Sequence, residues 1–373
     1  MPTGTNQLHA RRSRRHPRFG PTCSLRAWVR LLARHRIPPR RWPDALLATP
    51  FCLLHSALGA LQRTRYAGRL AAIEPHPEPV FILGHWRTGT TLLHELMATD
   101  ARFSFPSTYA CVFPHHHLLT ERMGSRLLAL PPNTVRGIDA MPMGWRRPQE
   151  EEYALYSLGM PSPYLAVGFP RELHAYDAWL TLDDVSPADR ARWMAVYLRF
   201  LKQVTLARPG PLVLKSPLHT FRIRLLLELF PRARFVHLVR DPFAVFASSV
   251  HALVYMAERY GLQPVERREV EDYVLWRFGQ MHAALERDRA LIPAHRLCEV
   301  RYEELVRDPP AALRGIYAAL GLPDFGAAEA AIRDRLADFD GYRPNRLTLS
   351  DARRRDVQRQ WAAWIDRYGY APA

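Results

Sequence analysis

Two glycines in the segment FILGHWRTGTT, Gly84 and Gly89, have the spacing of a phosphate-binding loop. In such a loop a lysine ordinarily follows the second glycine, whereas this chain has two threonines there. The apolar run VFIL precedes the loop and the helical pattern TTLLHELMAT follows it, so backbone N–H groups at the start of the helix can attract a phosphate. The sequence predicts an anion cradle without its lysine, formed by Arg87, Thr88, Gly89, Thr90 and Thr91.

Three polar residues follow two later apolar runs. Lys215 ends PLVLK, Arg240 ends RFVHLVR, and Ser248 lies in the helix predicted next. The carboxyl ends of parallel strands meet at the edge of a sheet where ligands bind, so these side chains are expected beside the glycine loop. Lys215 is one of only two lysines among 52 lysines and arginines, which indicates that a point charge is needed at this position.

Apolar runs and helical patterns alternate along the chain. Such alternation is typical of an α/β fold, with a central parallel sheet flanked by helices. The segment 103–170 is rich in proline, histidine and aromatic residues and is expected to form loops and short helices over the site. The last 20 or so residues are expected to form one helix. We expect buried strands in VFIL, PLVLKSP, RFVHLV and RLCEVRYEELV.

Four motifs, in this order, resemble those of the sulfotransferases that use 3′-phosphoadenosine 5′-phosphosulfate (PAPS), in particular the bacterial branch. They are GHWRTGTT, LKSP, ELFPRARFVHLVRDP with its later serine, and RYEELVRDP. The resemblance extends from about residue 78 to residue 370. It implies a P-loop-like α/β fold and a reaction that moves a sulfuryl group from PAPS to a hydroxyl, leaving adenosine 3′,5′-bisphosphate (PAP).

The resemblance also implies roles for individual residues. The segment RTGTT would hold the 5′-phosphosulfate, while Arg240 and Ser248 would hold the 3′-phosphate. Tyr302 of RYEELV would lie near the nucleotide. Lys215 matches a lysine that the family places beside the transferred group. The late segment YRPNRLTLS resembles a nucleotide-contacting segment of the family, which adds Arg346 as a candidate.

The expected chemistry requires no metal ion. A terminal sulfuryl group carries one negative charge, whereas a γ-phosphoryl group carries about two, so less neutralisation is needed. Charge develops on the bridging oxygen as the phosphate leaves, and a cation such as Lys215 would stabilise it there. A general base that takes the acceptor proton would add a further factor of roughly 10²–10⁴.

That base has two candidate sources, PHHH and RPQEEEYAL. We favour His116 and then Glu150. The alternatives are histidines that face solvent at a helix start and carboxylates that are solvated at a helix start, where they suit the helix dipole. Three consecutive histidines point in different directions, which disfavours a metal site. The candidates are His115, His116, His117, Glu150, Glu151 and Glu152.

Composition limits the partners. The 373-residue chain has a net charge of +16, which indicates an anionic partner of some kind. The run RRSRRHPR makes the N-terminal segment a basic arm, expected to be disordered. Basic residues are not interleaved with aromatic ones in any nucleic-acid-binding pattern, so no nucleic-acid partner is expected. The four cysteines lack metal-binding or disulfide spacing, so we expect a cytoplasmic location.

Three regions are expected along the chain: a basic arm at 1–25, a helical extension at 26–75 and the sulfotransferase domain at 76–373. The extension contains an apolar stretch, 45–61, interrupted by Pro50. It is shorter than the ~20 residues of a membrane span. A helix packed on the core is favoured over one in peripheral contact with a membrane. The aromatic middle segment favours a small apolar or lipid-like acceptor.

Two other classes of function remain open at this point. A P-loop nucleotide kinase would need a lysine after Gly89 and a magnesium-binding carboxylate. The candidate carboxylate, Asp241, follows Arg240, whose charge would repel a metal ion. A non-catalytic basic protein could instead bind membranes or nucleic acid through the arm and the stretch 45–61.

Overall fold

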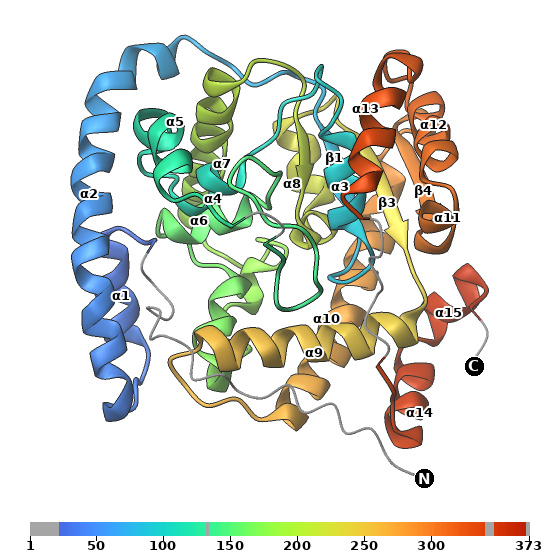
Figure 1. Ribbon diagram of the computed structural model, residues 1–373. Coiled ribbons are helices and arrows are strands. Elements are labelled where there is room, and N and C mark those ends of the chain that lie inside the picture. Colours follow the sequence, from blue (N-terminus) through green and yellow to red (C-terminus); the bar gives the residue numbers. More distant parts are fainter. Residues whose placement is uncertain (1–21, 132–133, 340–346, 371–373) are drawn as a thin grey trace.

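The computed structural model describes residues 22–131, 134–339 and 347–370, and a four-stranded parallel sheet lies at its centre (Figure 1). Every predicted apolar run contains one of the strands, but the last run, RLCEVRYEELV, is a strand only to Arg301 and continues as the helix α11 (Tyr302–Arg307). The order across the sheet is β2-β1-β3-β4, and Ile82 pairs with Lys215 at the carboxyl ends of β1 and β2. The strands are β1 (Val80–Leu83), β2 (Val213–Lys215), β3 (Arg234–Val239) and β4 (Leu297–Arg301).

Side chains of β1 alternate between two hydrophobic layers, and all four are fully buried. Val80 and Ile82 face the layer covered by α3, α12 and α13. Phe81 and Leu83 face the larger layer covered by α7, α8, α9 and α10. The helices are α3 (Thr90–Met97), α7 (Pro187–Ala207), α8 (Ile223–Leu229), α9 (Pro242–Tyr260), α10 (Arg267–Asp288), α11 (Tyr302–Arg307), α12 (Pro309–Ala319) and α13 (Gly326–Ala337).

The N-terminal extension consists of α1 (Leu25–Arg34) and the long α2 (Trp42–Ala71), which runs along one edge of the molecule (Figure 1). A narrow stripe of α2 packs on the domain, as favoured from the sequence. The opposite face leaves large apolar side chains exposed to solvent: Trp42, Leu46, Leu47, Phe51, Leu53, Leu54 and Leu61. The stretch Pro39–Ala71 is also long and apolar enough to cross a membrane.

The middle of the chain forms short elements over the sheet edge, as predicted. They are α4 (Thr108–Val112), α5 (His117–Leu127), α6 (Glu152–Ser157) and the 3₁₀ turn η2 (Pro163–Val167). A second 3₁₀ turn, η5 (Pro217–Phe221), follows β2 directly.

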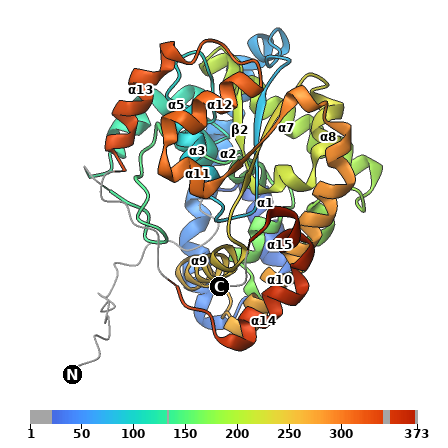
Figure 2. The ribbon, with the colours of Figure 1, turned by 90° about the vertical axis from the view of Figure 1, so that its right-hand side faces the viewer.

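The C-terminal helix expected as one element is two, α14 (Asp351–Gln360) and α15 (Ala362–Tyr368). They lie beside α10 (Figure 2), because Trp361 at the break stacks on Phe278 at 3.7 Å and its indole N–H donates to the Leu275 carbonyl. Burying that indole with its hydrogen bond explains the break in the helical pattern.

Candidate active site

The predicted phosphate loop lies between β1 and α3, and its backbone depends on Gly89. This residue has φ +94°, a left-handed conformation that favours glycine. A Cβ at this position would lie 2.3 Å from Cδ2 of Tyr302, so the ring of Tyr302 packs directly on the loop. The hydroxyl of Thr88 donates to the His85 carbonyl at 2.7 Å and closes the turn. Thr90 and Thr91 then begin α3.

The residues expected at the 3′-phosphate gather around Arg87. The Nε of Arg87 donates to the Ser248 hydroxyl at 2.9 Å, and an Nη of Arg240 donates to the Arg87 carbonyl at 2.7 Å. The guanidinium carbon of Arg240 lies 4.1 Å from the Tyr302 ring centroid. The structure thus brings Arg87, Arg240, Ser248 and Tyr302 together beside the loop. This arrangement offers two guanidiniums and a hydroxyl to an anion.

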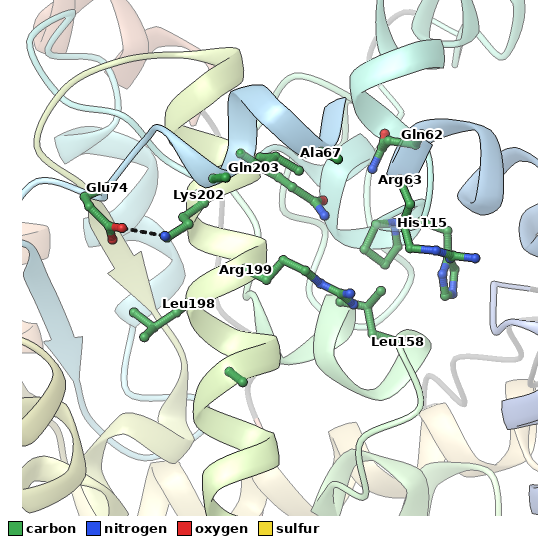
Figure 3. A pocket seen from close by; sticks show the side chains of 14 residues that line it. Gln62, Arg63, Ala67, Glu74, His115, Leu158, Leu198, Arg199, Lys202 and Gln203 are labelled. Carbon is green, nitrogen blue, oxygen red and sulfur yellow. Dashed lines mark hydrogen bonds and ion pairs between the residues drawn. The ribbon is translucent and has the colours of Figure 1, made fainter. Parts of the chain in front are cut away.

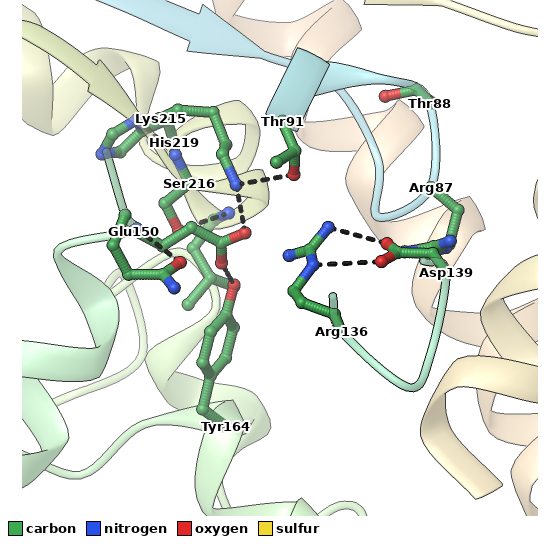
Figure 4. A network of polar contacts seen from close by, with 12 residues as sticks. Arg87, Thr88, Thr91, Arg136, Asp139, Glu150, Tyr164, Lys215, Ser216 and His219 are labelled. Carbon is green, nitrogen blue, oxygen red and sulfur yellow. Dashed lines mark hydrogen bonds and ion pairs between the residues drawn. The ribbon is translucent and has the colours of Figure 1, made fainter. Parts of the chain in front are cut away.

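A carboxylate that the sequence did not mark, Asp139, lies in this cluster (Figure 4). Its Oδ2 is 2.6 Å from an Nη of Arg87 and 2.7 Å from an Nη of Arg136. Burial raises the pKa of Asp139, but the charges of Arg136 and Arg87 outweigh burial and hold that pKa below its ordinary value. Asp139 comes from a loop without a periodic pattern, so no sequence signal indicated it.

Lys215 lies at the end of β2, where its ammonium meets the first turn of α3 (Figure 4). Its Nζ donates to the Thr91 hydroxyl at 3.2 Å and forms an ion pair with Glu150. The second oxygen of that carboxylate accepts a hydrogen bond from the Tyr164 hydroxyl. The Lys215 side chain is 2% exposed and that of Glu150 is 13% exposed, so the carboxylate is the more accessible partner.

The three consecutive glutamates each meet a different basic side chain. Glu150 pairs with Lys215, Glu151 with His219, and Glu152 with Arg222 at 2.9 Å. The expectation of a solvated helix start is therefore wrong for this run, because Glu151 and Glu152 are each 1% exposed. Their partners come from the LKSPLHTFR segment, whose turn after β2 places these basic side chains at the start of α6.

His116, the residue favoured as base, lies in a different cluster. Its Nε2 is 2.8 Å from the His55 Nδ1 of α2, and its Nδ1 is 2.8 Å from the Thr120 hydroxyl. Burial and then the neighbouring His55 lower the pKa of His116 to about 4. His116 and His117 are buried, so the alternative of solvent-facing histidines is wrong for these two. No contact joins His116 to the phosphate loop or to Lys215 within the described residues.

Two adjoining cavities open beside the Lys215–Glu150 pair. The first, of about 250 Å³, is lined by residues that include Thr91, Glu150 and Tyr164. The second, of about 390 Å³, shares Thr91 and Tyr164 with the first. The remaining lining is largely aromatic and aliphatic and includes Val167, Met256 and Tyr260 in both cavities. The site therefore offers an apolar path that ends at a carboxylate and a lysine.

Arg277 of α10 also lines the smaller cavity, and the sequence did not mark it. It is 6% exposed, and its guanidinium carbon lies 4.0 Å from the Trp86 ring centroid and 5.0 Å from that of Tyr273. Burial lowers the pKa of Arg277. Cation–π contacts contribute ~2 kcal/mol when desolvated, whereas burying an ion costs several kcal/mol. The rings therefore offset only part of the desolvation of this cation.

Two further expectations concern residues outside this cluster. Arg346 lies outside the described residues. Among the residues that the structure does describe, no three histidine, cysteine or acidic side chains are arranged to hold a metal ion. Asp241 caps α9 by accepting from the Phe243 N–H at 2.9 Å.

A glycine loop between a parallel strand and a helix, with a lysine at the end of the neighbouring strand, defines a P-loop-like transferase site. The model of the sulfotransferase family matches residues 79–326, more than half of the chain. The chain therefore belongs to the sulfotransferase family. The expected family, whose members take the sulfuryl group from PAPS, is confirmed, as are the enzyme class and the α/β fold.

Two relatives are similar over almost the whole chain. The omega-hydroxy-beta-dihydromenaquinone-9 sulfotransferase Stf3 of Mycobacterium bovis is 39% identical over 350 residues, which cover 93% of this chain and 90% of that protein. Its counterpart in Mycobacterium tuberculosis gives the same values. Family membership removes the nucleotide kinase and the non-catalytic basic protein as alternatives.

Two solved structures share the fold. Sulfotransferase STF9 from Mycobacterium avium aligns with a TM-score of 0.68 at 20% identity, covering 89% of this chain and 86% of its own. Sulfotransferase STF1 from Mycobacterium tuberculosis aligns with a TM-score of 0.62 at 18% identity, covering 91% and 92%. At these identities the likeness is evidence of the fold alone.

Proposed function

We propose that this sulfotransferase moves the sulfuryl group of PAPS to the hydroxyl of a long apolar alcohol, with Glu150 as general base and Lys215 as the cation beside the reacting group. One observation carries the proposal. Glu150 and Lys215 form an ion pair where the phosphate loop meets an apolar cavity. Glu150 therefore replaces His116 as the leading candidate base, because His116 contacts neither the loop nor the cavity.

The loop residues fit the donor. The Tyr302 ring occupies the space of a Cβ at Gly89, and the loop leads directly into the first turn of α3, where backbone N–H groups attract a phosphate. Thr90 and Thr91 present the first turn of α3, and Arg87 with Arg240 supplies the positive charge for the phosphates. The ring of Tyr302 packs on the loop at Gly89 and supports it. We also retain Arg346 as a proposed nucleotide contact.

When bound, PAPS supplies a sulfuryl group on a leaving phosphate. In the transfer, the bond from sulfur to the phosphate oxygen breaks and a bond from sulfur to the acceptor oxygen forms. Glu150 takes the hydroxyl proton of the acceptor, and the Tyr164 hydroxyl holds the second carboxylate oxygen in place. The Lys215 ammonium stabilises the negative charge that develops on the leaving oxygen.

The acceptor is proposed from the cavities together with the relatives. The lining is rich in tyrosine and methionine, and its charged residues outside the loop are Glu95, Arg136, Arg147, Glu150 and Arg277. The similar mycobacterial proteins are named for an omega-hydroxylated menaquinone derivative, which is an apolar chain that ends in a hydroxyl. A substrate of that class would place its hydroxyl at Glu150 and its chain in the second cavity.

A lipid-like acceptor has to be collected from a membrane, and α2 supplies a surface for this contact. Its seven exposed large apolar side chains lie opposite the stripe that packs on the domain. A helix buried along one side and apolar along the other suits a position flat on the membrane surface. The net charge of +16 favours anionic lipid.

The hollow beside α2 adds to this surface (Figure 3). It has a volume of about 620 Å³ and lies between α2 and α7. Lys202 is neutralised there by Glu74 at 2.5 Å. Arg63 and Arg199 also line the hollow, and no carboxylate within the described part of the chain pairs with either. Two unpaired guanidiniums at the edge of an apolar helix face are suited to lipid phosphates.

A transfer assay tests the proposal. Labelled PAPS is incubated with geranylgeraniol, a prenyl alcohol, and the product is identified by mass spectrometry. Wild-type protein should transfer the label, and PAP should bind in a calorimeter. Lys215→Met should lower kcat about 10²–10³-fold and leave the Kd for PAP within about threefold. Lys202→Met, which changes the only other lysine, is the matched control and should keep wild-type turnover.

A flotation assay tests the membrane contact separately. The combined variant Leu47→Gln, Phe51→Gln, Leu54→Gln should lose binding to vesicles of phosphatidylglycerol but keep PAP binding. A triple glutamine variant at the end of α5 removes similarly exposed apolar side chains at Met123, Leu127 and the C-cap residue Leu128, and is the control. Equal loss of binding in both variants would contradict a role for α2.

A further inference from the structure

Arg277 is the cation of the smaller cavity that has no carboxylate partner. Three guanidiniums line this cavity, and two of them, Arg87 and Arg136, share Asp139. No carboxylate lies within 4 Å of Arg277 among the described residues, and its Nε has no hydrogen-bond partner. A buried cation at a cavity wall therefore remains to be explained.

The surroundings of Arg277 hold its guanidinium in place without neutralising it. The rings of Trp86 and Tyr273 lie on it at 4.0 and 5.0 Å. The acid that acts on it from a distance is Asp177, whose carboxylate already accepts from Tyr273 at 3.4 Å and pairs with His174 at 2.6 Å. The positive charge is thus fixed in position and remains available to a group inside the cavity.

Aromatic contacts connect Arg277 to the proposed base. The Trp86 ring, which packs on Arg277, lies 6.0 Å from the Tyr164 ring, and the Tyr164 hydroxyl donates to Glu150. Arg277 and Glu150 therefore line the same small cavity, whose volume is about 250 Å³. A molecule whose hydroxyl is at Glu150 would extend into the cavity that Arg277 also lines.

We infer that Arg277 forms a subsite for a second oxygen of the acceptor, a carboxylate or carbonyl group on the part of the molecule that fills the small cavity beyond the reacting hydroxyl. The inference rests on the proposed function, because it takes Glu150 to mark the reacting end of the acceptor. A guanidinium presents parallel N–H groups that match two such oxygen lone pairs, and the burial of Arg277 strengthens that contact. Arg277 is in this sense a specificity-determining residue and takes no part in the transfer itself.

Two probes of equal size test the subsite by calorimetry on the PAP-loaded protein. They are 4-(hydroxymethyl)benzoate, which carries a carboxylate, and 4-methylbenzyl alcohol, which carries a methyl group in its place. The wild-type protein should bind the carboxylate probe at least tenfold more tightly. Arg277→Met should abolish this preference, and Arg277→Lys should retain part of it. Arg192→Met, on an exposed position of α7, removes the same charge and should keep the full preference.

Other results would overturn the subsite. They are equal binding of both probes by the wild-type protein, an unchanged preference in Arg277→Met, and a parallel loss of PAP affinity, which would assign the residue to the nucleotide. Thermal unfolding of each variant identifies a folding defect. If Arg277→Met fails to fold, two other results decide whether Arg277 forms the subsite. They are the preference of the wild-type protein for the carboxylate probe and the reduction of that preference in Arg277→Lys. The probe titrations are repeated on protein without PAP. Binding of PAP itself tests the proposed donor, so a failure of that proposal is separate from a failure of the subsite.

Discussion

Two runs of three titratable residues, His115–His117 and Glu150–Glu152, are buried in similar ways but have opposite surroundings. The glutamates meet the basic side chains of Lys215, His219 and Arg222. The histidines meet mostly uncharged partners: the Ser157 carbonyl, His55 and the Gln203 amide. Burial raises the pKa of Glu151, but His219 outweighs it and lowers that pKa, whereas burial lowers the pKa of His115 and His116 to about 4.

The contrast separates a charged cluster from a neutral one. A carboxylate that lies beside a substrate cavity is in position to accept a proton from the substrate. An imidazole kept neutral away from the cavity contributes packing and hydrogen bonds between α2 and α5. Burial of a titratable residue is therefore a poor guide to catalysis unless its partners and the nearest cavity are considered with it.

The largest effect is expected at Glu150. Glu150→Gln keeps the shape of the side chain and removes its ability to take a proton. The kcat should fall roughly 10²–10⁴-fold, while PAP affinity stays within about threefold, because the loop is unchanged. Stopped-time transfer assays and calorimetry measure the two quantities. His116→Gln is the matched comparison, and a larger loss of kcat there than at Glu150 would restore the histidine as the base.

A smaller effect, on stability, is expected within the same run. Glu152→Gln leaves the buried guanidinium of Arg222 without its carboxylate, and breaking a buried pair costs about 3–5 kcal/mol. Urea unfolding followed by tryptophan fluorescence measures the change. The kcat of the folded fraction should stay close to wild type, because Glu152 faces Ser162 and Arg222 and does not line either cavity. A loss of kcat equal to that of Glu150→Gln would mean that the whole run acts together.

The contacts of these residues also explain which parts of the site could be predicted from the sequence. The strands, the loop and Lys215 were predictable, because an apolar run fixes a buried strand and its end fixes the residue that follows. Glu150 was named only second, since its contact with Lys215 joins positions 65 residues apart and leaves no local pattern. Tyr164 and Arg277 line the cavity because η2 and α10 pack around it. No pattern in the sequence around either residue predicted this position.

A moderate loss of stability is expected for His116→Gln. The substitution removes at least one of the hydrogen bonds that His116 makes to His55 and Thr120 in a buried site, which costs about 1–3 kcal/mol. Turnover with saturating PAPS should change less than about threefold. Thermal unfolding and the transfer assay on the same preparation give both values. A stable variant with strongly reduced kcat would contradict this and indicate that His116 takes part in catalysis.

The smallest effect is a dependence of stability on pH, and its sign follows from the lowered pKa values of His115 and His116. Between pH 6.5 and their folded pKa of about 4, the unfolded chain binds protons that the folded protein does not bind. The free energy of unfolding should therefore fall as the pH falls through this range, by less than ~1.4 kcal/mol per pH unit for each histidine.

Urea unfolding between pH 6.5 and pH 5 measures the slope above the range where the carboxylates titrate. His116→Gln should reduce the slope, and His295→Gln, at an exposed position, is the control. An unchanged slope in His116→Gln would show that this histidine carries a proton in the folded protein, contrary to its neutral surroundings.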